Sequence, residues 1–98
     1  MLDWLGLDRI RMLREVIAAY EEEVALEQAR VASLREKLRQ TQFAQAEMEK
    51  QGKDRQAHAA SLMAHELRHR IESNEKQIQS MEQLLARFRG ELAGIHEK

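Results

Sequence analysis

Apolar residues recur along the chain at alternating steps of three and four, which is the spacing of a coiled-coil heptad. With Ile10 at position a, the first half places twelve residues at positions a and d, and nine of them are apolar. They are Ile10, Leu13, Ile17, Tyr20, Val24, Glu27, Val31, Leu34, Leu38, Thr41, Gln45 and Met48. A repeat of 3.5 residues that lasts about six heptads predicts a long helix with a coiled-coil seam.

The second half repeats the pattern more strictly. Eleven of its twelve a and d residues are apolar: Ala57, Ala60, Ala64, Leu67, Ile71, Asn74, Ile78, Met81, Leu85, Phe88, Leu92 and Ile95. Residues 49–56 between the halves contain Gly52 and no apolar residue. We therefore expect a single domain over 1–98, with an apolar arm at 1–7, a helix at 8–50, a turn at 51–54 and a helix at 55–95.

The predicted fold class is all-α, with two long helices in an antiparallel coiled-coil hairpin. Gly52 can end the first helix in the left-handed conformation, and Asp54 is a candidate N-cap of the second. One mid-helix glycine costs only about 1 kcal/mol, so an unbroken rod is the alternative. Register favours the hairpin, because placing residue i opposite about 105 − i aligns the two apolar seams.

Two polar residues interrupt this seam. Glu27 falls opposite Ile78, and Asn74 falls opposite Val31. A lone polar core residue lowers stability but fixes register, and we interpret Glu27 and Asn74 in this way. Glu27 could reach Asn74, or extend to Lys76 or to water.

A two-helix seam is narrow, so we expect the hairpin to pair with another copy or a partner, as a homodimer, a four-helix bundle or a larger oligomer. Apolar residues off the seam gather at the open end, away from the turn, and an N-cap at Asp8 would separate the arm from the helix. The predicted interface consists of Trp4, Leu5, Leu7, Met12, Val16, Ala19, Leu26 and Leu84. Alternatively, the arm folds over Gly90 and Gly94, where missing side chains leave room for Trp4.

Composition narrows the function. Charged residues make up 34% of the chain, the formal net charge is −1, and both proline and cysteine are absent. Interleaved charges without a basic excess argue against nucleic acid as a partner, and the lack of cysteine excludes thiol chemistry. We find no candidate membrane span and no signal-peptide pattern, so a cytoplasmic protein is expected.

His65-Glu66-Leu67-Arg68-His69 matches the H-E-x-x-H pattern of zinc proteases. A protease also needs a third ligand and a substrate cleft, and the seam residue Leu67 turns both histidines outward. Weak metal binding by His65 and His69, with His58 or Glu72, is the remaining possibility for this face.

The same stretch resembles the phosphoacceptor helix of sensor histidine kinases. Ala64-His65-Glu66-Leu67-Arg68 is similar to the common H-box, which implies His65 as the acceptor. Glu66-Leu67-Arg68-His69-Arg70-Ile71, with Asn74, Ile78 and Ser80 further on, is similar to the variant box of another kinase class, which implies His69 instead. The proline that follows the common box is missing, and no ATP-binding domain accompanies it, so chance convergence between helices is the preferred interpretation.

The sequence thus predicts a non-enzymatic interaction or structural module, without a cofactor. It would self-associate and bind a heterologous protein through its open end and outer faces, as an adaptor, an inhibitor or an assembly subunit. A histidine phosphotransfer or kinase-mimicking module that uses His65 or His69 is the alternative.

Overall fold

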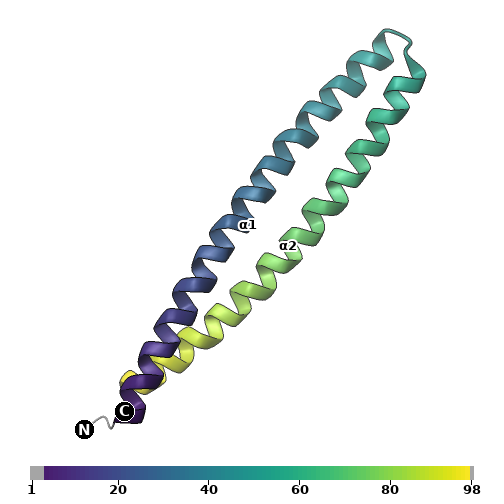
Figure 1. The fold of residues 1–98 in the computed structure, drawn as a ribbon. Coiled ribbons are helices and arrows are strands. Elements are labelled where there is room, and N and C mark those ends of the chain that lie inside the picture. The colour runs from purple at the N-terminus through teal and green to yellow at the C-terminus, as the bar shows by residue number, and fades with distance from the viewer. Residues whose placement is uncertain (1–3, 98) are drawn as a thin grey trace. The chain divides into compact units, whose positions relative to one another are not determined.

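The chain folds as two long helices that pack against each other in an antiparallel hairpin (Figure 1). In the computed structural model, α1 spans Trp4–Lys50 and α2 spans Asp54–Glu97. The structure describes residues 4–97, and side chains from residue 6 to residue 95. The predicted all-α hairpin is confirmed, and the unbroken rod is wrong.

The helices meet along the predicted seam. Every described side chain that is buried occupies an a or d position of the heptads. These residues are Ile10, Leu13, Ile17, Val24, Glu27, Val31, Ala57, Ala60, Ala64, Ile71, Met81 and Leu85. The remaining seam residues are half-buried, so none of the seam positions faces solvent fully. The 3.5-residue repeat therefore determines which face of each helix turns inward.

The hairpin divides into two compact units. Unit 1 combines residues 1–27 with residues 77–98, and unit 2 consists of residues 28–76. The core of unit 1 holds Ile17, Val24, Met81 and Leu85, with Tyr20, Ile78, Phe88 and Leu92 packed against it. The rings of Tyr20 and Phe88 are tilted by 36°, with centroids 5.9 Å apart. Unit 1 thus has the larger side chains and the only aromatic contact among the described residues.

Unit 2 has a core of smaller side chains. Ala57, Ala60 and Ala64 are its buried residues closest to the turn, and Val31 and Ile71 continue the seam. Alanine lets the helix backbones approach but removes little apolar area from water. The turn-proximal part of the seam therefore contributes less burial free energy per layer than the core of unit 1.

Ion pairs between the helices support the predicted register. Within unit 1, Arg9 Nη2 lies 3.8 Å from Glu91 Oε2, and Arg89 Nη2 lies 3.6 Å from Glu21 Oε1. Within unit 2, Arg35 pairs with Glu75. The residue numbers of these pairs sum to 100 or 110, on either side of the predicted 105. All three pairs join e to e or g to g positions, which flank the seam of an antiparallel coiled coil.

The turn ends α1 with a Schellman motif centred on Gly52. The Gly52 amide donates to the Glu49 carbonyl (3.1 Å), and the Lys53 amide donates to the Met48 carbonyl (2.9 Å). Gly52 has φ of 71°, in the left-handed region that disfavours other residues. The Lys53 carbonyl accepts the first bond of α2 from the Ala57 amide, so Lys53 holds the N-cap position. The expectation of Asp54 as N-cap is wrong by one residue, because Asp54 already belongs to the first turn.

The beginning of α1 also differs from expectation. The helix starts at Trp4, so residues 4–7 extend it, and Asp8 lies inside it rather than at its N-cap. The Asp8 carboxylate instead accepts a hydrogen bond from Arg11 (3.2 Å), one turn along the helix. The side chains of Leu2, Trp4 and Leu5 lie outside those the structure describes. Apart from adjacent residues and the backbone of α2 itself, no described atom lies within 4 Å of the position that a Cβ would take at Gly90 or Gly94.

We predict opposite effects of alanine at two glycines. Gly52→Ala should lower the free energy of unfolding by about 1 kcal/mol, because a side chain disfavours positive φ. Gly90→Ala should raise it by about 0.5–1 kcal/mol, because Gly90 is helical and a Cβ there meets open space. Urea unfolding followed by circular dichroism measures both. Equal effects of the two changes would contradict the role given to Gly52.

Candidate functional site

The heptads define two flanks beside the seam, and these flanks are the surfaces where a further helix can pack. We call the side formed by the g positions of both helices the g flank, and the side formed by the e positions the e flank. In unit 1 the g flank carries Arg9, Val16 and Glu23 from α1, and Leu84 and Glu91 from α2. The Arg9–Glu91 ion pair shows that g residues of the two helices meet on this side.

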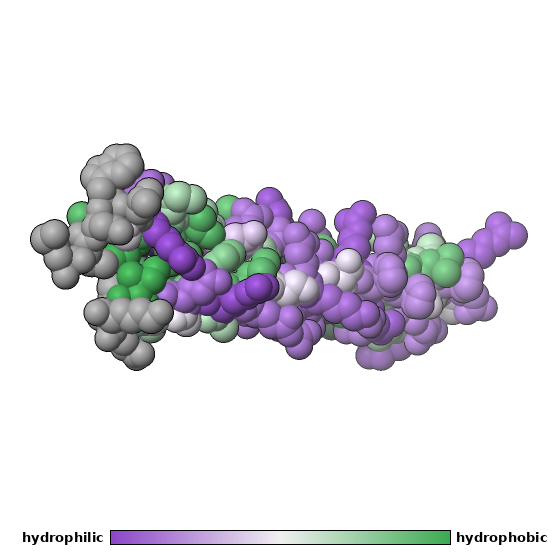
Figure 2. All heavy atoms as spheres, turned by 90° about the horizontal axis from the view of Figure 1, so that it is seen from below, coloured by the Kyte–Doolittle hydropathy of each residue, from purple (hydrophilic) through white to green (hydrophobic). Residues whose placement is uncertain are grey.

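An apolar stripe runs along the g flank of unit 1. Met12 and Leu26 are 59% and 50% exposed, Ala19 is also exposed, and Val16 is half-buried. These four residues occupy the c and g positions of α1, which are neighbours on one helix face. Leu84 of α2 is half-buried at the g position one heptad before Glu91. Hydrophobic atoms gather near the end of unit 1 on the face drawn in Figure 2, where most other residues are hydrophilic.

Not all residues of the predicted interface belong to this stripe. Leu7 is 55% exposed, but it occupies an e position and therefore faces the e flank. Trp4 and Leu5 belong to α1, and their side chains lie outside the described ones. The described part of the predicted interface thus reduces to Met12, Val16, Ala19, Leu26 and Leu84 on one flank.

Three exposed apolar residues in unit 2 were missed at the sequence level. Phe43 is 68% exposed, Leu62 58% and Met63 57%. Phe43 and Leu62 occupy f positions, which point away from the seam on their own helices, whereas Met63 occupies a g position. Testing every apolar residue outside a and d positions along the whole chain would have found them.

A groove with basic walls lies on the g flank of unit 2. One part of it is lined by Arg30, Ser33, Leu34, Lys37, Arg70 and Asn74. An adjoining part shares Lys37 and Arg70 and adds Gln40, Thr41, Met63, Glu66 and Leu67. Arg30, Lys37, Arg70 and Glu66 are thus the charged residues that line the groove, and Glu66 pairs with Arg70 along α2 at 3.4 Å.

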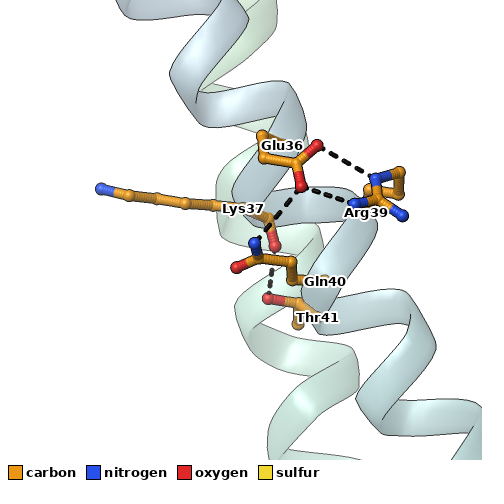
Figure 3. Close-up of polar contacts among 5 residues, drawn as sticks. All are labelled: Glu36, Lys37, Arg39, Gln40 and Thr41. Atoms are coloured by element: carbon orange, nitrogen blue, oxygen red, sulfur yellow. Dashed lines mark hydrogen bonds and ion pairs between the residues drawn. The ribbon is translucent and has the colours of Figure 1, made fainter.

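Figure 3 shows side-chain hydrogen bonds within α1 around Lys37, Gln40 and Thr41, three residues that line this groove. Arg39 donates from Nε and Nη2 to the Glu36 carboxylate, at 3.0 and 2.5 Å. The bond from Arg39 lowers the pKa of Glu36, and Glu36 in turn raises the pKa of Arg39. The Thr41 hydroxyl donates to the Lys37 carbonyl at 2.8 Å, whereas the Lys37 side chain is directed away from the other four labelled side chains. The Glu36–Arg39 pair is solvent-exposed and therefore adds little stability.

The two polar seam residues differ in burial. Glu27 in unit 1 is 3% exposed, and Asn74 in unit 2 is half-buried beside the basic groove. No buried side-chain nitrogen or oxygen among the described residues lacks a hydrogen-bond partner. Burial of a satisfied carboxylate at a core position is consistent with the register-setting role expected of Glu27.

Three histidines lie on the outside of α2. His58, His65 and His69 are all exposed, whereas Ala64 between them is 1% exposed and faces α1. Among the described residues, no three His, Cys, Asp or Glu side chains are arranged to hold a metal ion. The H-E-x-x-H match therefore consists of two outward imidazoles, and neither His58 nor Glu72 completes a three-ligand site with them.

Among the described residues, no helix is apolar and long enough to cross a membrane. Comparisons with protein-family models, curated protein sequences and solved structures gave no significant match for this chain. Functional conclusions therefore rest on its surfaces alone.

We predict that Glu27→Leu stabilises the hairpin while weakening its register. Leucine fits a seam position and removes the cost of burying a carboxylate, so the free energy of unfolding should rise by about 1 kcal/mol. Urea unfolding measures this change. Disulfide trapping between cysteines introduced at matched and shifted seam positions reports the register, and reduced stability of the variant would contradict our interpretation.

Proposed function

We propose that this protein is a non-enzymatic coiled-coil interaction module that self-associates through the apolar stripe of unit 1. The observation that carries the proposal is the exposure of Met12 and Leu26 on the same helix face as Val16 and Ala19. The hairpin would act as an adaptor, an inhibitor or an assembly subunit, and its remaining faces would be available to a heterologous protein.

The thin seam supports association. No large side chain among the described residues is less than 2% exposed, because two helices alone cannot surround a seam residue. Packing a second hairpin against the g flank would cover the stripe and the partly exposed edge of the seam, where Val16 and Leu84 are half-buried. Burial of this area is favourable at roughly 25 cal/mol per Å². A four-helix bundle is the assembly that this geometry favours.

Two charged g residues of α1, one before the stripe and one within it, favour a second copy as the occupant. Arg9 precedes the apolar residues at a g position, and Glu23 interrupts them at the g position two heptads later. An antiparallel pairing of two stripes about Val16 and Ala19 would place Arg9 of each copy beside Glu23 of the other. A two-fold axis makes this contact twice, which is the self-complementarity that an isologous dimer requires.

We predict a concentration-independent dimer mass in multi-angle light scattering, and Met12→Glu should convert the dimer to monomer. Met12 is 59% exposed, so the change should leave the hairpin folded while placing charge in the interface. Ala18→Glu is the matched control, because Ala18 is exposed at a b position of α1, outside the stripe. A monomeric wild-type chain over a hundredfold concentration range would refute self-association.

Charge reversal tests the pairing between copies. Glu23→Arg alone should weaken the dimer at least about tenfold by opposing Arg9 of the second copy, and Arg9→Glu should act similarly. The double variant Arg9→Glu/Glu23→Arg should recover most of the affinity, as measured by sedimentation equilibrium. Additive losses in the double variant would refute the antiparallel pairing, although not self-association itself.

The alternative is phosphotransfer at His65 or His69, and the outward exposure of both imidazoles favours it as a second candidate. Incubation with a phosphodonor histidine kinase should then label the chain, and His65→Gln or His69→Gln should remove the label. Failure to label either histidine would exclude this alternative, while leaving the interaction module unaffected.

A further inference from the structure

The two flanks of unit 2 differ in their charge arrangement. On the e flank, Arg35 of α1 pairs with Glu75 of α2, so opposite charges meet across the seam. On the g flank, Arg30, Lys37 and Arg70 line one groove and carry the same sign. Antiparallel coiled coils are stabilised by opposite charges at facing g positions, and like charges there repel. Unit 2 therefore has one flank with paired charges and one with a concentration of positive charge.

Two of the cations that line this groove, Lys37 and Arg70, are little neutralised within the described part of the chain. Glu66 Oε1 lies 3.4 Å from Arg70, but both side chains are more than 60% exposed and the pair is screened by solvent. Among the described residues, the Lys37 ammonium has no ion-pair partner, and its side chain points outward (Figure 3). Unit 2 as a whole carries ten lysines and arginines against seven acidic residues.

Apolar side chains accompany the cations in this groove. Leu34 and Leu67 are half-buried seam residues that line it, and Met63 stands at its edge with 57% of its surface exposed. Methionine adapts its shape to different apolar neighbours, which suits a surface that receives another side chain. The groove thus offers apolar contact along its centre and positive charge along its walls.

We propose that the g-flank groove of unit 2 binds an acidic amphipathic helix of a partner protein. A third helix laid along two antiparallel helices would place its apolar residues against Leu34, Leu67 and Met63. Arg30 and Lys37 are seven residues apart on α1, a rise of about 10 Å. Glutamates at heptad spacing on the bound helix therefore match them, and Arg70 on α2 faces the other edge of that helix.

Two other occupants are less compatible with the groove. A nucleic acid would leave the leucines and Met63 without apolar contact, and three cations are a small footprint for a phosphate backbone. A second copy of this chain is proposed above to occupy the apolar stripe of unit 1, which is a different surface. The proposal for the groove does not depend on that dimer.

The test measures binding of a fluorescent 21-residue peptide with leucines at a and d positions and glutamates at e and g positions. Fluorescence anisotropy should show saturable binding to the full chain, at least tenfold tighter than to the same peptide with lysine replacing each glutamate. The affinity should fall as salt concentration rises, because ion pairs at the groove walls are screened. Absence of saturable binding up to millimolar concentrations would overturn the proposal.

Matched charge reversals locate the site. Lys37→Glu/Arg70→Glu should weaken binding of the acidic peptide at least tenfold, whereas Arg55→Glu/Arg68→Glu should change it less than twofold. The control has the same change in net charge and affects exposed α2 residues outside the groove. Equal losses in the two variants would show non-specific attraction and overturn the proposal.

The alternative occupants have separate readouts. A single-stranded oligonucleotide that binds as tightly as the acidic peptide, and is equally sensitive to Lys37→Glu/Arg70→Glu, would overturn the assignment to a protein helix. Light scattering of the Lys37→Glu/Arg70→Glu variant should give the wild-type mass. A change of mass would identify a second copy as the occupant of the groove and likewise overturn it.

Discussion

Burial of one apolar residue at every third or fourth position is the interaction on which this hairpin depends. All the buried residues that the structure describes lie on the two facing seams, and neither helix has another source of burial within the chain. Helices of 47 and 44 residues are therefore held by a single row of contacts on each. The other faces of both helices contact solvent or other molecules. The flanks beside the seam are therefore the surfaces where a partner can bind.

The size of the seam side chains also varies along the hairpin and differs between the two units. Unit 1 packs Tyr20 and Phe88 beside Val24 and Leu85, whereas unit 2 relies on alanines near the turn. Larger side chains bury more apolar area and are worth more free energy. Local opening should therefore be easier near the turn, where the Schellman motif at Gly52 is the main constraint on the backbone. Unit 2, which contains this turn-proximal seam, also carries the excess of positive charge.

The g flanks of the two units carry different types of side chain, apolar in unit 1 and cationic in unit 2. In unit 1 the c and g positions of α1 carry Met12, Val16 and Leu26, which favour apolar self-association. In unit 2 the g positions carry Arg30, Lys37 and Arg70, which favour an anionic partner. A module that self-associates through an apolar surface and binds a partner chain through a basic surface would bring two copies of that partner together.

The heptad pattern by itself predicted the two long helices and their buried faces, because a 3.5-residue period keeps the same face of a helix turned toward its partner. Together with the break at residues 49–56, it also predicted the hairpin and its register. It also placed Glu27 in the seam. The pattern did not locate the first residue of α1 or the cap of α2, since both depend on local hydrogen bonds that many residues can make. Only the tertiary structure brought Arg70 of α2 into one groove with Arg30 and Lys37 of α1, because a flank is formed by two helices together.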